Sequence, residues 1–252
     1  FTSWSSCEDQ AATFQDNSSE NLGGQITSWL WNFGEPTSGA LNVSTLKDPT
    51  HTYSTPGLFD VTLIVTNLNG CSDTLQKQVT VKAAPVSNFF NSPGCLNSPT
   101  QFLADSTIIN IPATATYLWD FGDGNTAFSR NALHNYLAPG TYTVTLTITD
   151  TAGCVGDTSL PVTINPPPVA HFSANTDNCQ GQAVAFTDQS SSATGFINTW
   201  DWDFGDGNVQ TVVFPNIPNV SHTYGGAGTF SVTLTVTNSE GCTHSESRLV
   251  NM

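Results

Sequence analysis

Two loops of this chain carry pairs of aspartates three residues apart, among glycines that let the backbone curl. They read WDFGDGN, at 119–125 and at 202–208, and a related loop, WNFGEPT, stands at 31–37. Carboxylate oxygens gathered on a tight loop are the ligands that calcium takes in proteins. The candidate calcium ligands are the four aspartates of the first two loops, Asp120, Asp123, Asp203 and Asp206.

The same residues also suit a simple tight turn. Calcium takes six to eight oxygens, but each loop offers two aspartates and one asparagine, with no glutamate downstream at a suitable spacing. Turns select Asp for side-chain bonds to the backbone and Gly for positive φ. We therefore interpret the loops as turns and expect no cofactor. A weak calcium site at domain junctions is the alternative, because an acidic surface attracts divalent cations.

Three histidines each precede a tyrosine by two residues, in HTY, HNY and HTY. They are His51, His134 and His222, followed by Tyr53, Tyr136 and Tyr224. An active site needs unlike groups that converge, such as a nucleophile, a base and an orienting group. Single histidines at equivalent positions of separate units do not converge. We expect structural hydrogen bonds near the end of each unit, no catalytic residue, and no enzyme activity.

Charge excludes two classes of partner. The 252 residues include 5 basic and 20 acidic side chains, for a net charge of -15. Nucleic acids and anionic lipids are bound through Lys and Arg, so we expect neither nucleic-acid binding nor membrane insertion. No run approaches the ~18 apolar residues of a membrane span. Six cysteines suit an oxidising, extracellular or cell-surface location.

The elements that position these residues recur three times. Cysteine, Phe seven residues later, the W-x-F-G loop, H-x-Y, a glycine and a second cysteine follow one another in the same order in each copy. Copies meet at the proline-rich segments VKAAPVSNFF and INPPPVAHFS. We expect repeats at 1–83, 84–167 and 168–252. The first has the degenerate WNFGEP turn and a truncated N-terminal strand, which indicates that the chain is cut from a longer array.

Each repeat reads as strands. The stretch TYTVTLTITD alternates apolar residues with threonine, which is typical of a strand with one face in a core. No segment has sustained helical periodicity. Strands at 8 to 12 residue spacing in units of ~85 residues predict an all-β chain of small antiparallel β-sandwiches.

These motifs resemble those of the polycystic-kidney-disease (PKD) type of immunoglobulin-like domain. Repeat 2 has the full set, WDFGDGN, HNY and PGTYTVTLTIT; repeat 3 lacks the proline, and repeat 1 departs most. The resemblance implies three tandem immunoglobulin-like sandwiches, which we expect to form a rod. The cysteine positions are similar to those of repeats in long surface adhesins of Bacteroidota. That similarity implies O-glycosylation at D-[S/T]-x sites, and the candidates are Thr74, Ser106 and Thr151.

In such a sandwich the loop aromatics have a structural role. Exposed aromatic strips bind sugars, but a Trp on the third strand normally fills the core. We therefore place Trp31, Trp119 and Trp202 in the core, with Phe33, Phe121 and Phe204 beside them.

Six cysteines allow fifteen pairings, and two schemes stay open. Pairs within a repeat would be Cys7 with Cys71, Cys95 with Cys154, and Cys179 with Cys242. An immunoglobulin-like path separates those turns by about 20 Å, too far for a disulfide. Pairs between successive repeats would be Cys7 with Cys154 and Cys95 with Cys242. Cys71 and Cys179 would then bond further repeats or subunits.

Together these features predict an extracellular structural or adhesive module, a stalk or filament segment of a large bacterial surface protein. Its partners would be neighbouring repeats or subunits, and surface glycans or host or environmental matrix. One alternative is an accessory array of a secreted hydrolase that binds collagen or glycans. Another is a subunit of a filament that assembles through its terminal repeats.

Overall fold

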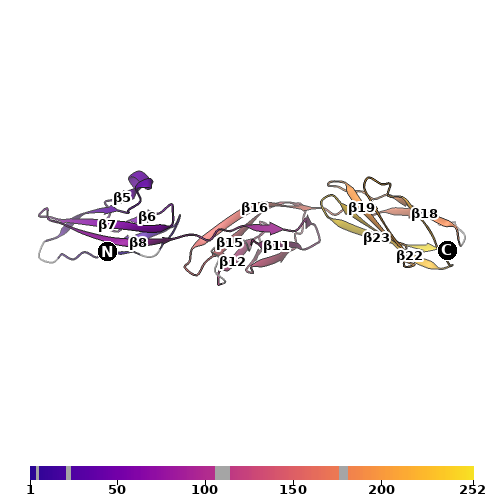
Figure 1. Ribbon diagram of the computed structural model, residues 1–252, viewed down its shortest axis with the longest axis horizontal. Coiled ribbons are helices and arrows are strands. Elements are labelled where there is room, and N and C mark those ends of the chain that lie inside the picture. Colours follow the sequence, from indigo (N-terminus) through magenta and orange to yellow (C-terminus); the bar gives the residue numbers. More distant parts are fainter. Residues whose placement is uncertain (4–5, 21–23, 106–113, 176–180) are drawn as a thin grey trace. The chain divides into compact units, whose positions relative to one another are not determined.

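The computed structural model describes residues 1–3, 6–20, 24–105, 114–175 and 181–252. In these residues the chain is almost entirely β-structure, and one short 3-10 helix interrupts it. The strands fall into three successive groups of similar order, labelled in Figure 1. The all-β fold class and the tandem sandwiches predicted from the sequence are confirmed.

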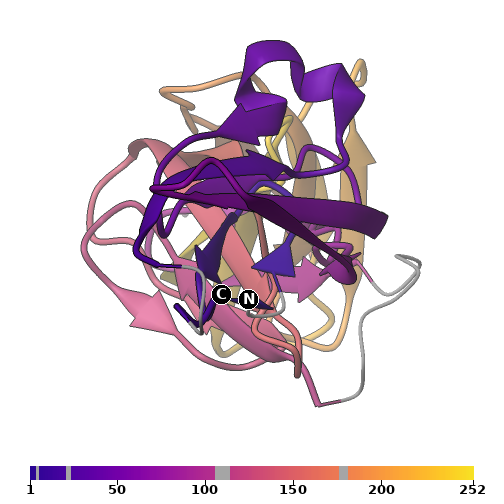
Figure 2. The ribbon, with the colours of Figure 1, turned by 90° about the vertical axis from the view of Figure 1, so that its left-hand side faces the viewer.

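In the described part of repeat 1, two sheets face each other. Strands β1 (Thr2–Ser3), β3 (Ala11–Gln15) and β6 (Thr50–Thr52) form one, in the order β1-β3-β6. The other runs β2-β8-β7-β4-β5 and contains β2 (Ser6–Cys7), β4 (Ile26–Asn32), β5 (Val43–Ser44), β7 (Gly57–Asn67) and β8 (Ser72–Lys82). The helix η1 (Pro36–Asn42) lies outside both sheets (Figure 2).

Repeats 2 and 3 follow the same plan. Repeat 2 has the sheet β14-β11-β9, built from β9 (Phe89–Asn91), β11 (Thr100–Ala104) and β14 (Asn131–His134). Its second sheet, β10-β16-β15-β12-β13, contains β10 (Gly94–Cys95), β12 (Thr116–Asp120), β13 (Thr126–Ala127), β15 (Gly140–Thr149) and β16 (Val155–Asn165).

Repeat 3 has β17 (Phe172–Ala174), β18 (Ala183–Asp188) and β21 (Val220–Thr223) in the sheet β17-β18-β21. Opposite stands β20-β19-β22-β23, with β19 (Ile197–Asp203), β20 (Val209–Val213), β22 (Thr229–Asn238) and β23 (Thr243–Asn251).

A tryptophan fills the centre of every sandwich. Trp119 is fully buried, and its ring centroid lies 5.6 Å from that of Phe102 and 5.2 Å from that of Phe89, which come from the opposite sheet. The same arrangement holds for Trp31 with Phe14 and Phe1, and for Trp202 with Phe186 and Phe172. The rest of the core comes from strand residues whose side chains alternate between the two faces of a sheet: on β15, Val144, Leu146 and Ile148 face inward.

The glycine after each loop phenylalanine is set by a close approach of two strands. Gly122 has φ +75°, and a Cβ there would stand 2.5 Å from the carbonyl oxygen of Thr143 on β15. Gly34 and Gly205 are placed in the same way against Asp60 and Ser231. By contrast, Gly124 has φ +91° with open space around it. The first glycine of the loop is therefore required by both backbone conformation and packing.

We expect Gly122→Ala to destabilise repeat 2 by about 2 to 4 kcal/mol, from the left-handed conformation together with the clash against β15. Gly124→Ala meets only the conformational penalty and should lose about 1 kcal/mol. Hydrogen exchange of β12 and β15 amides under increasing urea measures both values. Equal losses in the two variants would show that the close approach does not matter.

Candidate functional site

Each repeat contains one cluster of a histidine, a carboxylate and two aromatic rings, here called the His–acid cluster. In repeat 2, Nε2 of His134 lies 2.7 Å from Oδ2 of Asp123. The imidazole stacks on Phe121, with 4.1 Å between ring centroids, and meets the ring of Tyr136 edge-on at 4.5 Å. Repeat 3 builds the same cluster from His222, Asp206, Phe204 and Tyr224. Repeat 1 builds it from His51, Glu35, Phe33 and Tyr53.

The loop sequence aims the carboxylate at the histidine. Oδ1 of Asp120 accepts the Gly122 N–H at 2.9 Å, which starts the turn. Oδ1 of Asp123 accepts the Asn125 N–H at 3.0 Å, so its Oδ2 is left to face His134. The loop is thus a turn whose two aspartates have different tasks, one local and one across the sandwich.

A hydrogen bond from a tyrosine hydroxyl stabilises the other side of the same loop. The hydroxyl of Tyr136 donates to the carbonyl oxygen of Phe121 at 3.1 Å, and Tyr53 and Tyr224 make the same bond to Phe33 and Phe204. This bond resembles the tyrosine corner of immunoglobulin domains, in which a tyrosine hydroxyl bonds to the backbone a few residues upstream.

Repeat 1 keeps the cluster although its loop sequence differs. Oδ1 of Asn32 accepts the Gly34 N–H at 2.9 Å, as aspartate does in the other copies. Glu35 replaces the second aspartate: Oε2 lies 3.0 Å from Nε2 of His51, and Oε1 accepts the Ser54 hydroxyl at 2.7 Å. Asn42, at the end of η1, donates to Asn32 and accepts the Glu35 N–H. We did not assign Glu35 or Asn42 from the sequence, although the carboxylate four residues after each core tryptophan was a usable signal.

Electrostatics hold the carboxylates ionised. Burial raises the pKa of Glu35, but hydrogen bonds from Ser54 and His51 outweigh it and hold that pKa below its usual range. The pKa values of Asp123 and Asp206 are lowered in the same way, with burial opposed by bonds from histidine and asparagine. Burial, with the charge of Asp206, raises the pKa of Tyr224 to about 12. Each cluster therefore contains an ionised acid and a protonated tyrosine, which suits a structural role in holding the loop.

The candidate calcium ligands all have protein partners. Oδ1 of Asp203 accepts the Gly205 N–H at 2.9 Å, and Oδ1 of Asp206 accepts the Asn208 N–H at 3.0 Å. In the described residues, no three histidine, cysteine or acidic side chains group as a metal site would require. Calcium binding by these loops is a prediction that only a titration can test.

Two disulfides join successive repeats. Cys7 bonds to Cys154 and Cys95 to Cys242, each with 5.5 Å between Cα atoms. Contacts divide the chain into two compact units, and each bond lies inside one of them. The first unit holds Cys7 and Cys154, in 1–88 and 146–158, and the second holds Cys95 and Cys242, in 89–104 and 159–252.

The scheme of pairs within a repeat is wrong, for a reason visible in the strand register. Strand β2 runs parallel to the end of β8, with Cys7 beside Lys82. Cys71 precedes the start of the same strand, so the length of β8 separates the two sulfurs by about 30 Å. Cys95 and Cys154 are kept apart in the same way by β16, because Cys95 lies beside Asn165.

The second cysteine of each repeat is presented by the same turn. Oδ1 of Asp150 accepts the Cys154 N–H at 2.8 Å, and Gly153 takes φ +84°. Asn238 and Asn67 hold Cys242 and Cys71 through equivalent bonds. Cys71 is exposed and makes no disulfide, whereas Cys179 is outside the described residues. The polar residue four positions before each of these cysteines was a second signal that we did not use.

The proposed glycosylation sites are only partly described. Thr74 is exposed on β8, and Thr151 is exposed in the turn before Cys154. Ser106 is outside the described residues. Modification at these positions stays a prediction.

Comparison with known proteins agrees with this architecture. The family model described as PKD domain matches residues 2–83, 82–164 and 165–251. This chain belongs to the PKD domain family. Its PKD repeats are similar to parts of Collagenase ColA from Bacillus cereus, 39% identical over 75 residues, which are 30% of this chain and 8% of that protein. They are also similar to the pre-pro-metalloprotease PrtV from Vibrio cholerae, 29% identical over 148 residues, 56% of this chain and 16% of that protein.

A solved structure, the PKD1 domain of Epp from Vibrio anguillarum, is 32% identical with a TM-score of 0.31, and it covers 35% of this chain and 95% of that chain. The PKD repeats thus span less than a fifth of these curated relatives. PKD domains are non-catalytic modules. Among the described residues, no helix has the length and hydrophobicity of a membrane span.

We expect Glu35→Gln to destabilise repeat 1 by about 1 to 3 kcal/mol at pH 7, because an amide cannot accept bonds from both His51 and Ser54. The pKa of Glu35 is lowered by folding, so its contribution is present above the pKa of the unfolded chain, near 4.5, and is lost as the pH falls through the folded value. Urea unfolding followed by tryptophan fluorescence at pH 7 and at pH 3 measures the free energy of unfolding. The difference in this free energy between wild type and Glu35→Gln should be smaller at pH 3.

The matched control is Asp120→Asn, which gives repeat 2 the side chain that repeat 1 already uses at Asn32. This change should stay within about 0.5 kcal/mol of wild type. A loss as large as that of Glu35→Gln would mean that the clusters do not distinguish the two acids of the loop.

Proposed function

We propose that this PKD array is a segment of an extracellular stalk, and that its task is to transmit force between parts of a larger surface protein. One observation carries the proposal: each repeat is bonded covalently to the next through equivalent cysteines, and the partners are 147 positions apart in both bonds. A disulfide of this kind persists in an oxidising compartment. A binding module alone would not need its repeats to be joined in series.

The two disulfides overlap along the chain, which shortens the covalent path between the termini. From Phe1 the shortest path crosses from Cys7 to Cys154, returns to Cys95, crosses to Cys242 and ends at Met252. It contains about 75 residues, which can extend to about 270 Å, whereas the reduced chain can extend to about 900 Å. Even when all repeats are unfolded, the two disulfides therefore keep most residues out of the path that bears the load.

Pulling on the two ends tests this function. We expect the oxidised chain to stop extending at about 270 Å in single-molecule force spectroscopy, and the chain with reduced disulfides to reach roughly three times that length. Cys71→Ser is the matched control, because Cys71 takes part in neither bond and its removal should leave the limit unchanged. Equal extension of oxidised and reduced chains would contradict a covalent load path.

A second candidate is an accessory array that holds a secreted hydrolase on collagen or glycan. Two observations favour it: the likeness to a stretch of Collagenase ColA, and an exposed aromatic pair on repeat 3. Phe196 and Phe214 are 54% and 58% exposed, with their ring centroids 5.3 Å apart. Exposed aromatic rings of this kind offer contact area at low entropic cost.

If the accessory function holds, the PKD array should be retained on insoluble collagen or on a polysaccharide, and Phe196→Ala with Phe214→Ala should weaken retention about tenfold. Phe128→Ala on repeat 2 removes a ring that is 77% exposed and serves as the control. Absence of retention by the wild-type chain would remove this candidate and leave the stalk untouched.

The filament alternative adds assembly between chains to the same design. Cys71 lies in a turn equivalent to those that present the bonded Cys154 and Cys242, and this supports bonding of Cys71 to a further repeat or subunit. Adhesion to glycans or matrix along the array is a separate proposal, tested by the retention assay.

A further inference from the structure

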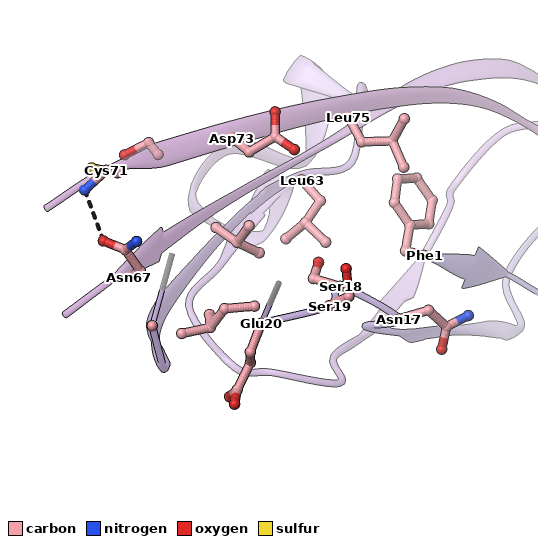
Figure 3. Close-up of a pocket in the computed structure, with 14 residues that line it drawn as sticks. Phe1, Asn17, Ser18, Ser19, Glu20, Leu63, Asn67, Cys71, Asp73 and Leu75 are labelled. Atoms are coloured by element: carbon pink, nitrogen blue, oxygen red, sulfur yellow. Dashed lines mark hydrogen bonds between the residues drawn. The ribbon is translucent and has the colours of Figure 1, made fainter. Parts of the chain in front are cut away.

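Repeat 1 has a cleft beside Cys71, with a volume of about 410 Å³. Phe1, Leu63 and Leu75 line its apolar side, and Asp73 stands on its rim (Figure 3). The cleft lies along the first half of β8, the strand that follows the Cys71 turn.

A core residue is uncovered in this cleft. Val65 of β7 lines it and is only half-buried. Its equivalents in the other repeats, Ile148 and Val236, are completely buried. In repeats 2 and 3 another part of the described chain therefore covers this position.

In repeat 2 the connector before the first strand lies on this face. The Ser87 hydroxyl donates to Oγ1 of Thr158 at 2.8 Å, and Thr158 donates to the Ser87 carbonyl at 2.7 Å. The carbonyl of Pro85 lies so close to Gly156 that a Cβ there would collide with it. Pro85 and Ser87 are both buried, whereas Val86 between them is exposed.

In repeat 3 the next connector repeats the arrangement. The Ala170 N–H donates to Nδ1 of His244 at 2.9 Å, and the Phe172 N–H donates to Oε2 of Glu246 at 3.1 Å. Pro168 and Ala170 are buried, two residues apart, as Pro85 and Ser87 are. Both connectors thus bind as extended segments that insert a proline and then a small residue.

The register of these contacts is parallel to the last strand. Residues 85 and 87 lie against 156 and 158, and 170 and 172 lie against 244 and 246. By the contacts of repeat 2, residue 83, two positions before Pro85, aligns with Cys154, whereas by the contacts of repeat 3 the proline itself, Pro168, aligns with Cys242. On repeat 1, Asp73 and Leu75 occupy the positions of Gly156 and Thr158, and Cys71 that of Cys154.

We propose that the cleft of repeat 1 is a binding site for an extended connector segment of the pattern Pro-x-Ser or Pro-x-Ala, presented from outside the described chain. The proline and the small residue cover Val65 and the apolar side formed by Leu63 and Leu75. Backbone N–H groups of the segment are satisfied on the rim, where the Asp73 carboxylate takes the place that His244 Nδ1 has in repeat 3. The inference rests on the cleft and on its two occupied equivalents, and it does not depend on the stalk function.

The cleft can be tested by disulfide tethering at Cys71 in the full chain carrying Cys179→Ser. The probe is the capped peptide Cys-Ala-Pro-Val-Ser-Asn, which is the connector 83–88 with cysteine in the position that aligns with Cys71 by the contacts of repeat 2. The control peptide, Cys-Ala-Asp-Val-Lys-Asn, replaces the two inserted residues by charged ones. In a thiol buffer, we expect the equilibrium constant for capture, read by intact mass, to be about tenfold higher for the connector peptide.

A variant of the cleft separates binding from thiol reactivity. Leu75 is 43% exposed, so Leu75→Glu should fold while placing a charge on the apolar side. We expect this variant to capture both peptides equally, with near-ultraviolet circular dichroism unchanged. Equal capture of both peptides by the parent chain, or an unchanged preference in the folded Leu75→Glu variant, would overturn the proposal.

Discussion

The packing of one tryptophan between phenylalanines of the facing sheet is the contact on which the rest of each repeat depends. Trp119 lies within 5.6 Å of Phe102 and Phe89, and the chain must then turn directly after Phe121. That turn presses Gly122 against β15 and leaves room only for a residue without a side chain. It also brings Asp123 to His134. The core, the turn and the hydrogen bond between Asp123 and His134 are therefore consequences of a single packing arrangement.

Repeat 1 shows which parts of this arrangement the fold requires. Asparagine at 32 preserves the acceptor, and glutamate at 35 preserves the charge with one more methylene, which η1 and Asn42 accommodate. Chemical function at each position is kept while the residue type changes. The loop motif thus reflects a set of required hydrogen bonds, and more than one combination of residue types can make them.

Much of the fold followed from the sequence because its signals are local. Threonine alternation defines the long strands, and the spacing of cysteine, tryptophan and histidine defines three repeats. The disulfide pairs did not follow, because they depend on Cys7 lying beside Lys82, a parallel contact that no local pattern announces. Glu35 was missed for a different reason: in repeat 1 the motif around it is lost, and only its distance from Trp31 marks its role. Exposure of Val65 is likewise invisible in the sequence, since its strand reads like those of the other repeats.

The order of the cysteines has a consequence for how the chain matures. Each native bond skips the two cysteines that lie between its partners: Cys71 and Cys95 inside the first, Cys154 and Cys179 inside the second. Oxidation in the order of synthesis would join Cys7 to Cys71 if it came before repeat 1 folds, because the length of β8 separates the two in the folded repeat. The native partners meet only when two successive repeats have folded. A cell that produces this array therefore has to delay oxidation or exchange disulfides that form early. The presence of the native disulfides thus indicates that the repeats they join have folded.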